Sequence, residues 1–143
     1  MLLELLATGF FVGKLPVAPG TFGTLLAVPF VWFFSLDERL FRLALAVLFF
    51  LGWLSAEWVV RKTGLKDPEE VVIDEVFGYA VAFLFVEPDG RTLLTGFVLF
   101  RLLDVFKPFP VNLFEHFPGG LGVMADDAAA GLLTGLLLLI LFS

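Results

Sequence analysis

The chain has 143 residues, of which 59% are hydrophobic, 16% are aromatic and only 17% are charged. Soluble domains average about 45–50% apolar and about 25% charged residues, so this composition departs from the soluble class. A domain of this size exposes a large share of its surface, which leaves too little interior for so many apolar side chains. We therefore expect an integral membrane protein with a single domain, residues 1–143.

The chain carries a formal net charge of −6 and contains no cysteine. An acidic chain lacks the basic face that binds nucleic acid, so nucleic acid is not an expected partner. The absence of cysteine excludes disulfides, thiolate nucleophiles and cysteine-ligated metals. The apolar N-terminus has neither a basic region nor a small-residue cleavage site, so we do not expect a removable signal peptide.

The apolar segments predict an all-α architecture. Residues 1–12 are too short to span a bilayer and predict an interfacial or packed helix. About five short transmembrane or membrane-embedded helices are predicted after it: residues 22–36, 40–60, 71–86, 92–106 and 126–142. Several fall short of the about 20 residues that a full span needs, so tilted or incomplete crossings are expected. Proline and glycine in residues 13–24 predict a loop, in which Thr21 or Thr24 caps the next helix.

If all five segments cross the bilayer, the polar stretches at residues 13–24, 61–70 and 101–127 lie on one side of it. That side carries six of the nine basic residues, namely Lys14, Arg61, Lys62, Lys66, Arg101 and Lys107. The positive-inside bias then makes this side cytoplasmic. The polar stretches therefore face one compartment, which predicts a single site on the cytoplasmic face of a multi-pass protein.

Five carboxylates lie within about one turn of the predicted cytoplasmic helix ends: Asp74, Glu75, Asp104, Asp126 and Asp127. Hard oxygen ligands of this kind suit Mg²⁺, which binds through one or two carboxylates together with substrate phosphate. Arg101 and Lys107 supply positive charge for phosphate oxygens. Charged residues at helix ends are often only interfacial markers. In a chain with so few charges, the convergence of five acids and two bases on one face favours a functional site.

Other features give weaker signals. The glycine-rich stretches at residues 13–24 and 119–122 match neither a Walker A sequence nor a dinucleotide fingerprint. His116 is the only histidine, and a surface or loop role is favoured for it over catalysis. Glu57 could pair with another residue or extend to the interface, and both readings stay open. Without a thiolate or a nucleophile elbow, the remaining routes are metal-assisted attack by water or an aspartyl-phosphate intermediate.

Four blocks of the sequence resemble the bacterial phosphatidylglycerophosphatase A family. They read LPVAPGTFGT (residues 15–24), DPEEVVIDEVFG (67–78), FRLLDVFKPFP (100–110) and GGLGVMADDAAAG (119–131). They stand in the family's order and span nearly the whole chain. Small departures fall at Thr24, Lys14 and Val123, and none removes an ionisable group from the blocks.

This resemblance implies Mg²⁺-dependent hydrolysis of the phosphomonoester of phosphatidylglycerophosphate, a lipid of the bacterial inner membrane, to phosphatidylglycerol and phosphate. It implies metal ligands among Asp74, Glu75, Asp104, Asp126 and Asp127. Catalytic roles are expected for Asp74, Glu75, Asp104 and Asp127, with Asp127 or Glu75 as the base. Phosphate binding is expected from Thr21, Gly23, Arg101 and Lys107.

The alternative reading is a small membrane transporter or ion-binding protein that uses the same carboxylates. Such a protein would carry charges through the depth of the bilayer or on both of its faces. In this sequence the charged residues of the four blocks gather at one predicted face, which favours chemistry at a membrane surface.

Overall fold

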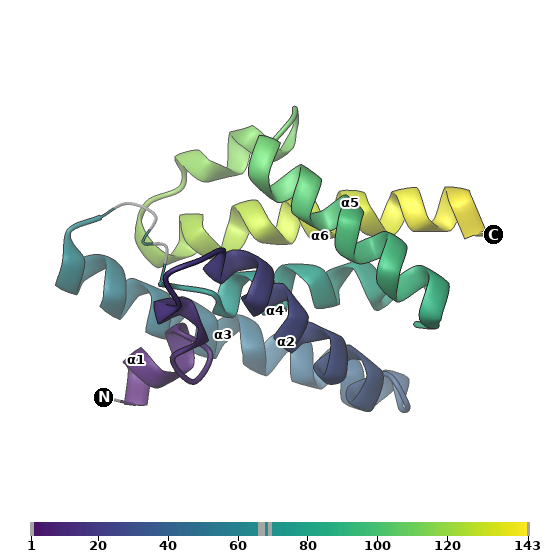
Figure 1. Cartoon of the computed structure of the whole chain (residues 1–143), viewed down its shortest axis with the longest axis horizontal. Coiled ribbons are helices and arrows are strands. Elements are labelled where there is room, and N and C mark those ends of the chain that lie inside the picture. Colours follow the sequence, from purple (N-terminus) through teal and green to yellow (C-terminus); the bar gives the residue numbers. More distant parts are fainter. Residues whose placement is uncertain (1, 66–67, 69, 143) are drawn as a thin grey trace.

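The computed structural model describes residues 2–65, 68 and 70–142, and in these ranges it contains helices and no strand (Figure 1). The all-α prediction is confirmed. In chain order the elements are α1 (Leu2–Ala7), η1 (Val12–Lys14), α2 (Pro19–Phe34), α3 (Glu38–Thr63), α4 (Ile73–Val81), η2 (Ala82–Leu84), α5 (Gly90–Phe106), η3 (Val111–His116) and α6 (Gly119–Phe142). Lys66 and the side chain of His116 lie outside what the structure describes, so the expectations for them stay predictions.

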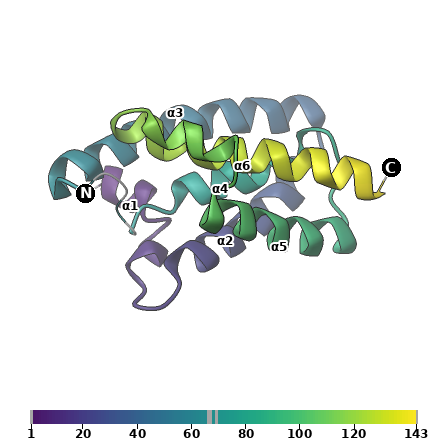
Figure 2. The same cartoon turned by 90° about the horizontal axis from the view of Figure 1, so that it is seen from above.

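Helix α4 forms the centre of the molecule, with α2, α3, α5 and α6 packed around it (Figures 1 and 2). Its buried residues are Ile73, Asp74, Phe77, Gly78, Tyr79, Ala80 and Val81. Nine residues of helix rise only about 14 Å, against a hydrocarbon core of about 30 Å. The apolar segment predicted over residues 71–86 is therefore a short core helix, too short to cross a membrane by itself.

Two helices in the described part of the chain, α3 with 26 residues and α6 with 24, are long and apolar enough to cross a membrane. Helix α2 is apolar but shorter, at 16 residues. Large apolar side chains lie on the molecular surface, among them Leu36, Phe106 and Ile140, which are 80%, 75% and 74% exposed. These features are consistent with a membrane protein. The expected count of about five crossing helices stays a prediction.

Helix α2 begins earlier than predicted, at Pro19 instead of after the loop at residues 13–24. Proline is well tolerated in the first turn because its missing N–H would have no partner there. The residue before it, Ala18, adopts a left-handed conformation with φ 47°, and no side chain caps the helix. The predicted cap at Thr21 or Thr24 is therefore wrong. The Thr24 hydroxyl instead donates to the Gly20 carbonyl at 2.8 Å, inside the helix.

Helices α3 and α5 begin with side-chain caps that the sequence carries. The Asp37 carboxylate accepts hydrogen bonds from the backbone N–H groups of Arg39 and Leu40. Asp89 and Thr92 form a reciprocal capping box at the start of α5. Such caps satisfy backbone donors that have no partner within the helix. These two helix starts are therefore fixed by local sequence.

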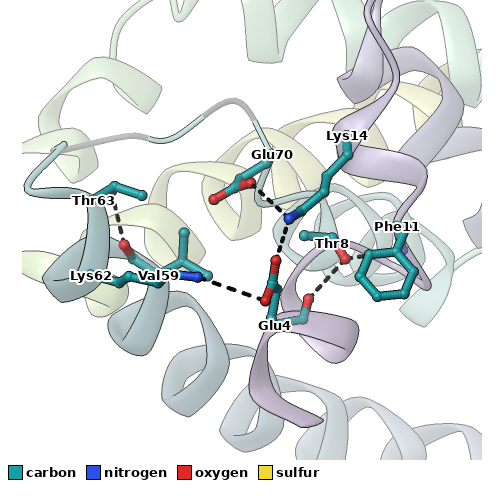
Figure 3. Close-up of polar contacts among 8 residues, drawn as sticks. All are labelled: Glu4, Thr8, Phe11, Lys14, Val59, Lys62, Thr63 and Glu70. Atoms are coloured by element: carbon teal, nitrogen blue, oxygen red, sulfur yellow. Dashed lines mark hydrogen bonds and ion pairs between the residues drawn. The ribbon is translucent and has the colours of Figure 1, made fainter. Parts of the chain in front are cut away.

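The N-terminal segment is held to the rest of the molecule by a cluster of charges around Glu4, which we call the Glu4 cluster (Figure 3). Glu4 forms an ion pair with Lys14 and lies 3.7 Å from the Lys62 ammonium of α3. Lys14 also lies 3.9 Å from the Glu70 carboxylate. In addition, the Val72 N–H donates to the Ala7 carbonyl at 2.8 Å. These contacts fix the chain just before α4 begins.

Candidate active site

A close crossing of α4 and α6 places two of the predicted acids opposite each other. A Cβ added at Gly131 would overlap the carbonyl oxygen of Gly78, and one added at Gly78 would lie 2.5 Å from the carbonyl oxygen of Asp127. Only glycine allows two backbones to approach so closely. Asp74 and Asp127 each stand four residues before one of these glycines, so their side chains share the faces that meet.

The C-terminal end of α5 brings further charged groups to this crossing. Arg101 donates from Nη1 to the Asp104 carboxylate at 2.7 Å. Lys107, which ends α5 in a left-handed conformation with φ 46°, donates to Asp104 at 3.2 Å and to Asp126 at 2.9 Å. Lys107 therefore links α5 to α6. Cations are also favourable near the negative end of the α5 dipole.

The N-terminus of α2 closes a third side of the site at Gly20. A Cβ at this position would lie 3.0 Å and 3.1 Å from the two terminal nitrogens of Arg101, and 3.2 Å from Oε1 of Glu75. Any larger residue would have to displace the guanidinium or the carboxylate. The backbone of the Pro-Gly-Thr block is thus in contact with the charged groups of α4 and α5.

The carboxylate oxygens are grouped closely enough to hold a cation. One oxygen each from Asp74, Asp126 and Asp127 lie within 4.8 Å of one another, and the same is true of Glu75, Asp104 and Asp127. Asp127 belongs to both groups, which we call together the carboxylate cluster. Four of these five acids are buried, and Glu75 is partly buried.

Three buried oxygens of the carboxylate cluster have no hydrogen-bond partner among the described residues: Asp74 Oδ1, Glu75 Oε2 and Asp127 Oδ2. A buried polar atom without a partner is costly, and a buried carboxylate is costlier still. In proteins, Mg²⁺ and Ca²⁺ are bound by oxygen ligands, among them the carboxylates of Asp and Glu. The donor set therefore fits a divalent cation.

Lys107 stays charged in this environment. Burial alone would lower its pKa, but the neighbouring carboxylates of Asp104, Asp126 and Asp127 outweigh burial and raise the pKa of Lys107 above its ordinary value. The site thus contains a permanent cation next to an excess of acids. Such a cation can stabilise phosphate oxygens without changing its own protonation.

The start of α6 depends on a residue that sequence reasoning left open. The Glu57 carboxylate of α3 accepts a hydrogen bond from the Gly120 N–H at 2.7 Å, across 63 positions of sequence, and also pairs with Arg61 at 3.0 Å. Glu57 therefore caps α6 in place of a local side chain. The helix consequently begins at Gly119, and Asp126 and Asp127 lie inside it instead of at its start.

Sequence analysis singled out Glu57 and left pairing and extension to the interface open, and the structure shows pairing. Its partner is a backbone N–H far along the chain, and no side-chain pattern marks such a partner.

The structure brings together all five predicted acids with Arg101 and Lys107. The two residues of α2 that were predicted to bind phosphate, Thr21 and Gly23, have different surroundings. Thr21 is partly buried in the first turn of α2, next to Gly20. Gly23 is buried against Val72, whose Cβ would lie 2.6 Å from a Cβ at that position. A packing role is thus evident for Gly23, and phosphate binding by Thr21 and Gly23 stays a prediction.

A buried carboxylate cluster beside two cations could bind phosphate through a divalent cation, which defines the class of site. Comparison with known sequences narrows this class. Residues 5–142 match the family described as phosphatidylglycerophosphatase A. The chain belongs to this family, as its four sequence blocks predicted.

Curated relatives agree with this membership. The chain is 34% identical to phosphatidylglycerophosphatase A of Escherichia coli K12, covering 92% of this chain and 78% of the relative. It is 31% identical to phosphatidylglycerophosphatase A of Haemophilus influenzae Rd, covering 91% and 82%. It is also 36% identical, over 94% and 89%, to a Bacteroides thetaiotaomicron protein provisionally named a phosphatidylinositol-3-phosphatase. No solved structure matches the chain.

Proposed function

We propose that this protein hydrolyses the phosphomonoester of phosphatidylglycerophosphate to phosphatidylglycerol and inorganic phosphate, with Mg²⁺ as its cation. The observation that carries this proposal is the carboxylate cluster, whose buried unpaired oxygens lie beside Arg101 and Lys107. The substrate is suggested by the family and by the printed names of two curated relatives.

The cation ligands are proposed to come from the five acids of the two oxygen groups, Asp74, Glu75, Asp104, Asp126 and Asp127. A bound divalent cation would neutralise phosphate charge and lower the pKa of an attacking water. Mg²⁺ is preferred as the occupant because it commonly binds through few carboxylates plus substrate phosphate.

The phosphate is proposed to lie between Arg101 and Lys107. Arg101 now donates to Asp104, and its guanidinium also borders the backbone at Gly20. A guanidinium can bind two phosphate oxygens at once, whereas an ammonium acts as a point charge. The backbone N–H groups of the first turn of α2, including that of Thr21, can add further donors to an anion.

A carboxylate of the cluster is proposed to accept the proton from the attacking water. Asp127 and Glu75 are the two candidates that the family resemblance suggested. Each has a buried oxygen with no hydrogen-bond partner in the described chain, a property that Asp74 shares. Asp104 is the weaker candidate, since Arg101 and Lys107 already occupy both of its oxygens.

We further propose a multi-pass protein of the bacterial inner membrane with this site on its cytoplasmic face. Arg61 pairs with Glu57, which also binds the Gly120 N–H at the start of α6, and Lys62 and Lys14 both lie against Glu4. Basic residues of this kind favour the cytoplasmic side. A lipid headgroup at that surface can reach the site without leaving the membrane.

A second candidate substrate is phosphatidylinositol 3-phosphate, which the provisional name of the Bacteroides relative suggests. Both lipids present a phosphate monoester on a headgroup, so the same cluster could serve either. The transporter alternative is less well supported, because the unpaired carboxylate oxygens gather in one cluster beside the ends of α2, α4 and α5.

The decisive experiment measures phosphate release by the purified protein from each lipid in mixed micelles, with Mg²⁺ and with EDTA. We expect release from phosphatidylglycerophosphate with Mg²⁺ and its loss in EDTA. Faster release from phosphatidylinositol 3-phosphate would replace the substrate assignment. Absence of metal-dependent release from both lipids would refute the proposed function.

A further inference from the structure

A long apolar groove of about 410 Å³ runs along α6. Its floor is formed by α6, chiefly by Ala125, Ala129 and Leu132, and its walls by Phe49 of α3 and by Pro110 and Phe114 of the segment between α5 and α6. Ligand pockets in proteins measure about 300–1,000 Å³, so the groove is large enough for a ligand. The carboxylate cluster does not line it.

The groove, which is lined by residues from Phe117 and Leu121 to Leu136, nevertheless passes beside the carboxylate cluster. Ala125 precedes Asp126 in sequence, and Ala129 follows Asp126 by three residues, which places Ala129 and Asp126 next to each other on the helix surface. On the opposite wall, Pro110 stands three residues after Lys107. The ion pair between Lys107 and Asp126, at 2.9 Å, therefore lies at the boundary between the charged site and the apolar groove.

The direction of the groove matches a lipid chain. Along α6 the groove is lined from Leu121 to Leu136, and its part from Ala125 to Leu136, from the level of Asp126 onward, rises about 16 Å. Half of a hydrocarbon core of about 30 Å is about 15 Å, the depth of one leaflet. Because α6 is a candidate membrane span, the groove would run from the level of the acids into the bilayer.

The small side chains at Ala125, Ala128 and Ala129 are what make the surface concave. An amphiphile with an anionic phosphate and an apolar tail complements this feature, since Lys107 lies beside the groove near Ala125 and only apolar side chains line the groove from there to Leu136. An extended peptide segment would leave its backbone polar groups without partners in such a groove. An acyl chain has no such groups.

We infer that this groove binds one acyl chain of the lipid phosphomonoester while its phosphate lies at the carboxylate cluster. This inference rests on the proposed function and adds to it a second determinant of substrate recognition. The protein would accordingly prefer a diacyl substrate over the same substrate without its acyl chains.

The kinetic test fills the groove with Ala129→Phe. We expect the ratio of kcat/KM for the diacyl substrate to kcat/KM for the deacylated headgroup to fall at least about tenfold, because displacing two buried methylenes is enough for that. The control is Val47→Phe, which adds the same ring to a 48% exposed position of α3 outside the groove. There the ratio should keep its wild-type value. Equal ratios in both variants would overturn the inference.

A second variant covers the case in which Ala129→Phe does not fold. Leu132→Ser places a hydroxyl on the groove floor at a 45% exposed position, where no packing is lost from the interior. We expect the same direction of change in the ratio, with the thermal unfolding temperature in detergent close to that of the wild type. A fall in kcat/KM that is equal for both substrates would contradict acyl-chain binding.

A binding experiment separates failure of the groove from failure of the proposed function. The protein is placed in phosphatidylcholine vesicles with a photoreactive acyl-chain analogue of phosphatidylglycerophosphate, and cross-linked peptides are identified by mass spectrometry. We expect cross-links within residues 125–136, lost in Ala129→Phe and competed by unlabelled substrate. This result would stand even for a protein with no phosphatase activity.

Three outcomes of the binding experiment would refute the inference. Equal labelling by photoreactive phosphatidylcholine would show that bulk lipid fills the groove. Labelling spread over the exposed faces of α2 and α5 would show that the groove holds no particular chain. A change of oligomeric state in Ala129→Phe would show that a second copy of the chain covers it.

Discussion

The carboxylate cluster and the Glu4 cluster use the same kinds of side chain in opposite ways. In the Glu4 cluster, one glutamate faces two lysines, and Lys14 has a second glutamate nearby (Figure 3). In the carboxylate cluster, five acids face Arg101 and Lys107, and three of their buried oxygens have no partner in the described chain. A cluster that only holds the fold together balances its charges. A surplus of buried acid is unfavourable for folding, and a cluster of this kind could hold a cation that offsets the repulsion.

The largest contrast between the two clusters is expected from Asp127→Asn. It removes a charge that belongs to both oxygen groups, so phosphate release should fall at least about 100-fold. The metal-free variant should be as stable as the wild type or more stable, because repulsion among buried acids is reduced. Phosphate release and thermal unfolding in detergent, each with and without Mg²⁺, measure the two effects. Glu4→Gln is the matched control and should keep its activity. Near-normal turnover in Asp127→Asn would refute the site.

Gly131→Ala should disturb the carboxylate cluster through the backbone. Its new Cβ would overlap the carbonyl of Gly78, so α4 and α6 must move apart, which costs about 1–3 kcal/mol. Activity should fall with stability, because Asp74 and Asp127 separate as well. The control is Gly90→Ala, where a Cβ meets nothing within 4 Å. Chemical denaturation of both variants tests this, and equal stability would contradict the close crossing.

Lys107→Gln and Lys14→Gln compare a lysine from each cluster. Loss of Lys107 should raise KM about tenfold, because a charge-assisted hydrogen bond is worth about 1.5–3 kcal/mol. Loss of Lys14 should leave KM unchanged. Because the pKa of Lys107 is raised by its carboxylates, no ionisation of this lysine should appear in the rate profile of the wild type near neutral pH. If KM is unchanged in both variants, the prediction that Lys107 binds the phosphate is wrong.

Glu57→Ala should weaken the α6 end of the site by removing its cap, at a cost of about 0.5–2 kcal/mol. Glu57→Gln retains an oxygen for the Gly120 N–H and should restore most of the loss, although it gives up the pair with Arg61. The Mg²⁺ concentration for half-maximal activity should rise in the alanine variant and return in the glutamine variant. Identical behaviour of the two variants would show that the ion pair, and not the cap, is what matters.

The smallest effect is expected from titration of Glu4. The hydrogen bond from Lys14 lowers the pKa of Glu4 below its usual value of 4.5, although desolvation acts in the other direction. A lowered pKa means that the stabilising contribution is present above the usual value and is lost as the pH falls through the lowered one. The difference in unfolding temperature between wild type and Glu4→Gln should therefore shrink as the pH falls below 4.5 and vanish below the lowered pKa. A difference that persists there would contradict the pairing.

Local sequence was sufficient for several features of the fold. Composition and the succession of apolar segments predicted an all-α chain, and the caps at Asp37 and Asp89 can be read from residues next to the helix starts. Where the partner is distant, prediction failed. The start of α2 was misplaced because Ala18 caps it without a side-chain hydrogen bond, and the start of α6 because Glu57 supplies the cap from another helix.

The candidate site shows the same division. Sequence supplied its chemistry, since five acids and two cations near the predicted helix ends pointed to a cation and a phosphate. It could not supply Gly20 as a neighbour of Arg101, nor the meeting of Gly78 with Gly131. Those contacts depend on how the helices cross, which side-chain spacing within one helix does not encode.

The sequence by itself determined the helical class, the family and the set of ionisable residues, because these follow from composition and from residues close together along the chain. The tertiary structure alone decided that α4 is a short buried core helix, that Asp127 belongs to both oxygen groups, and that an apolar groove passes beside the Lys107–Asp126 pair. The physical reason is that helix packing is set by close approach at glycines and by surface shape. Both are properties of two helices together.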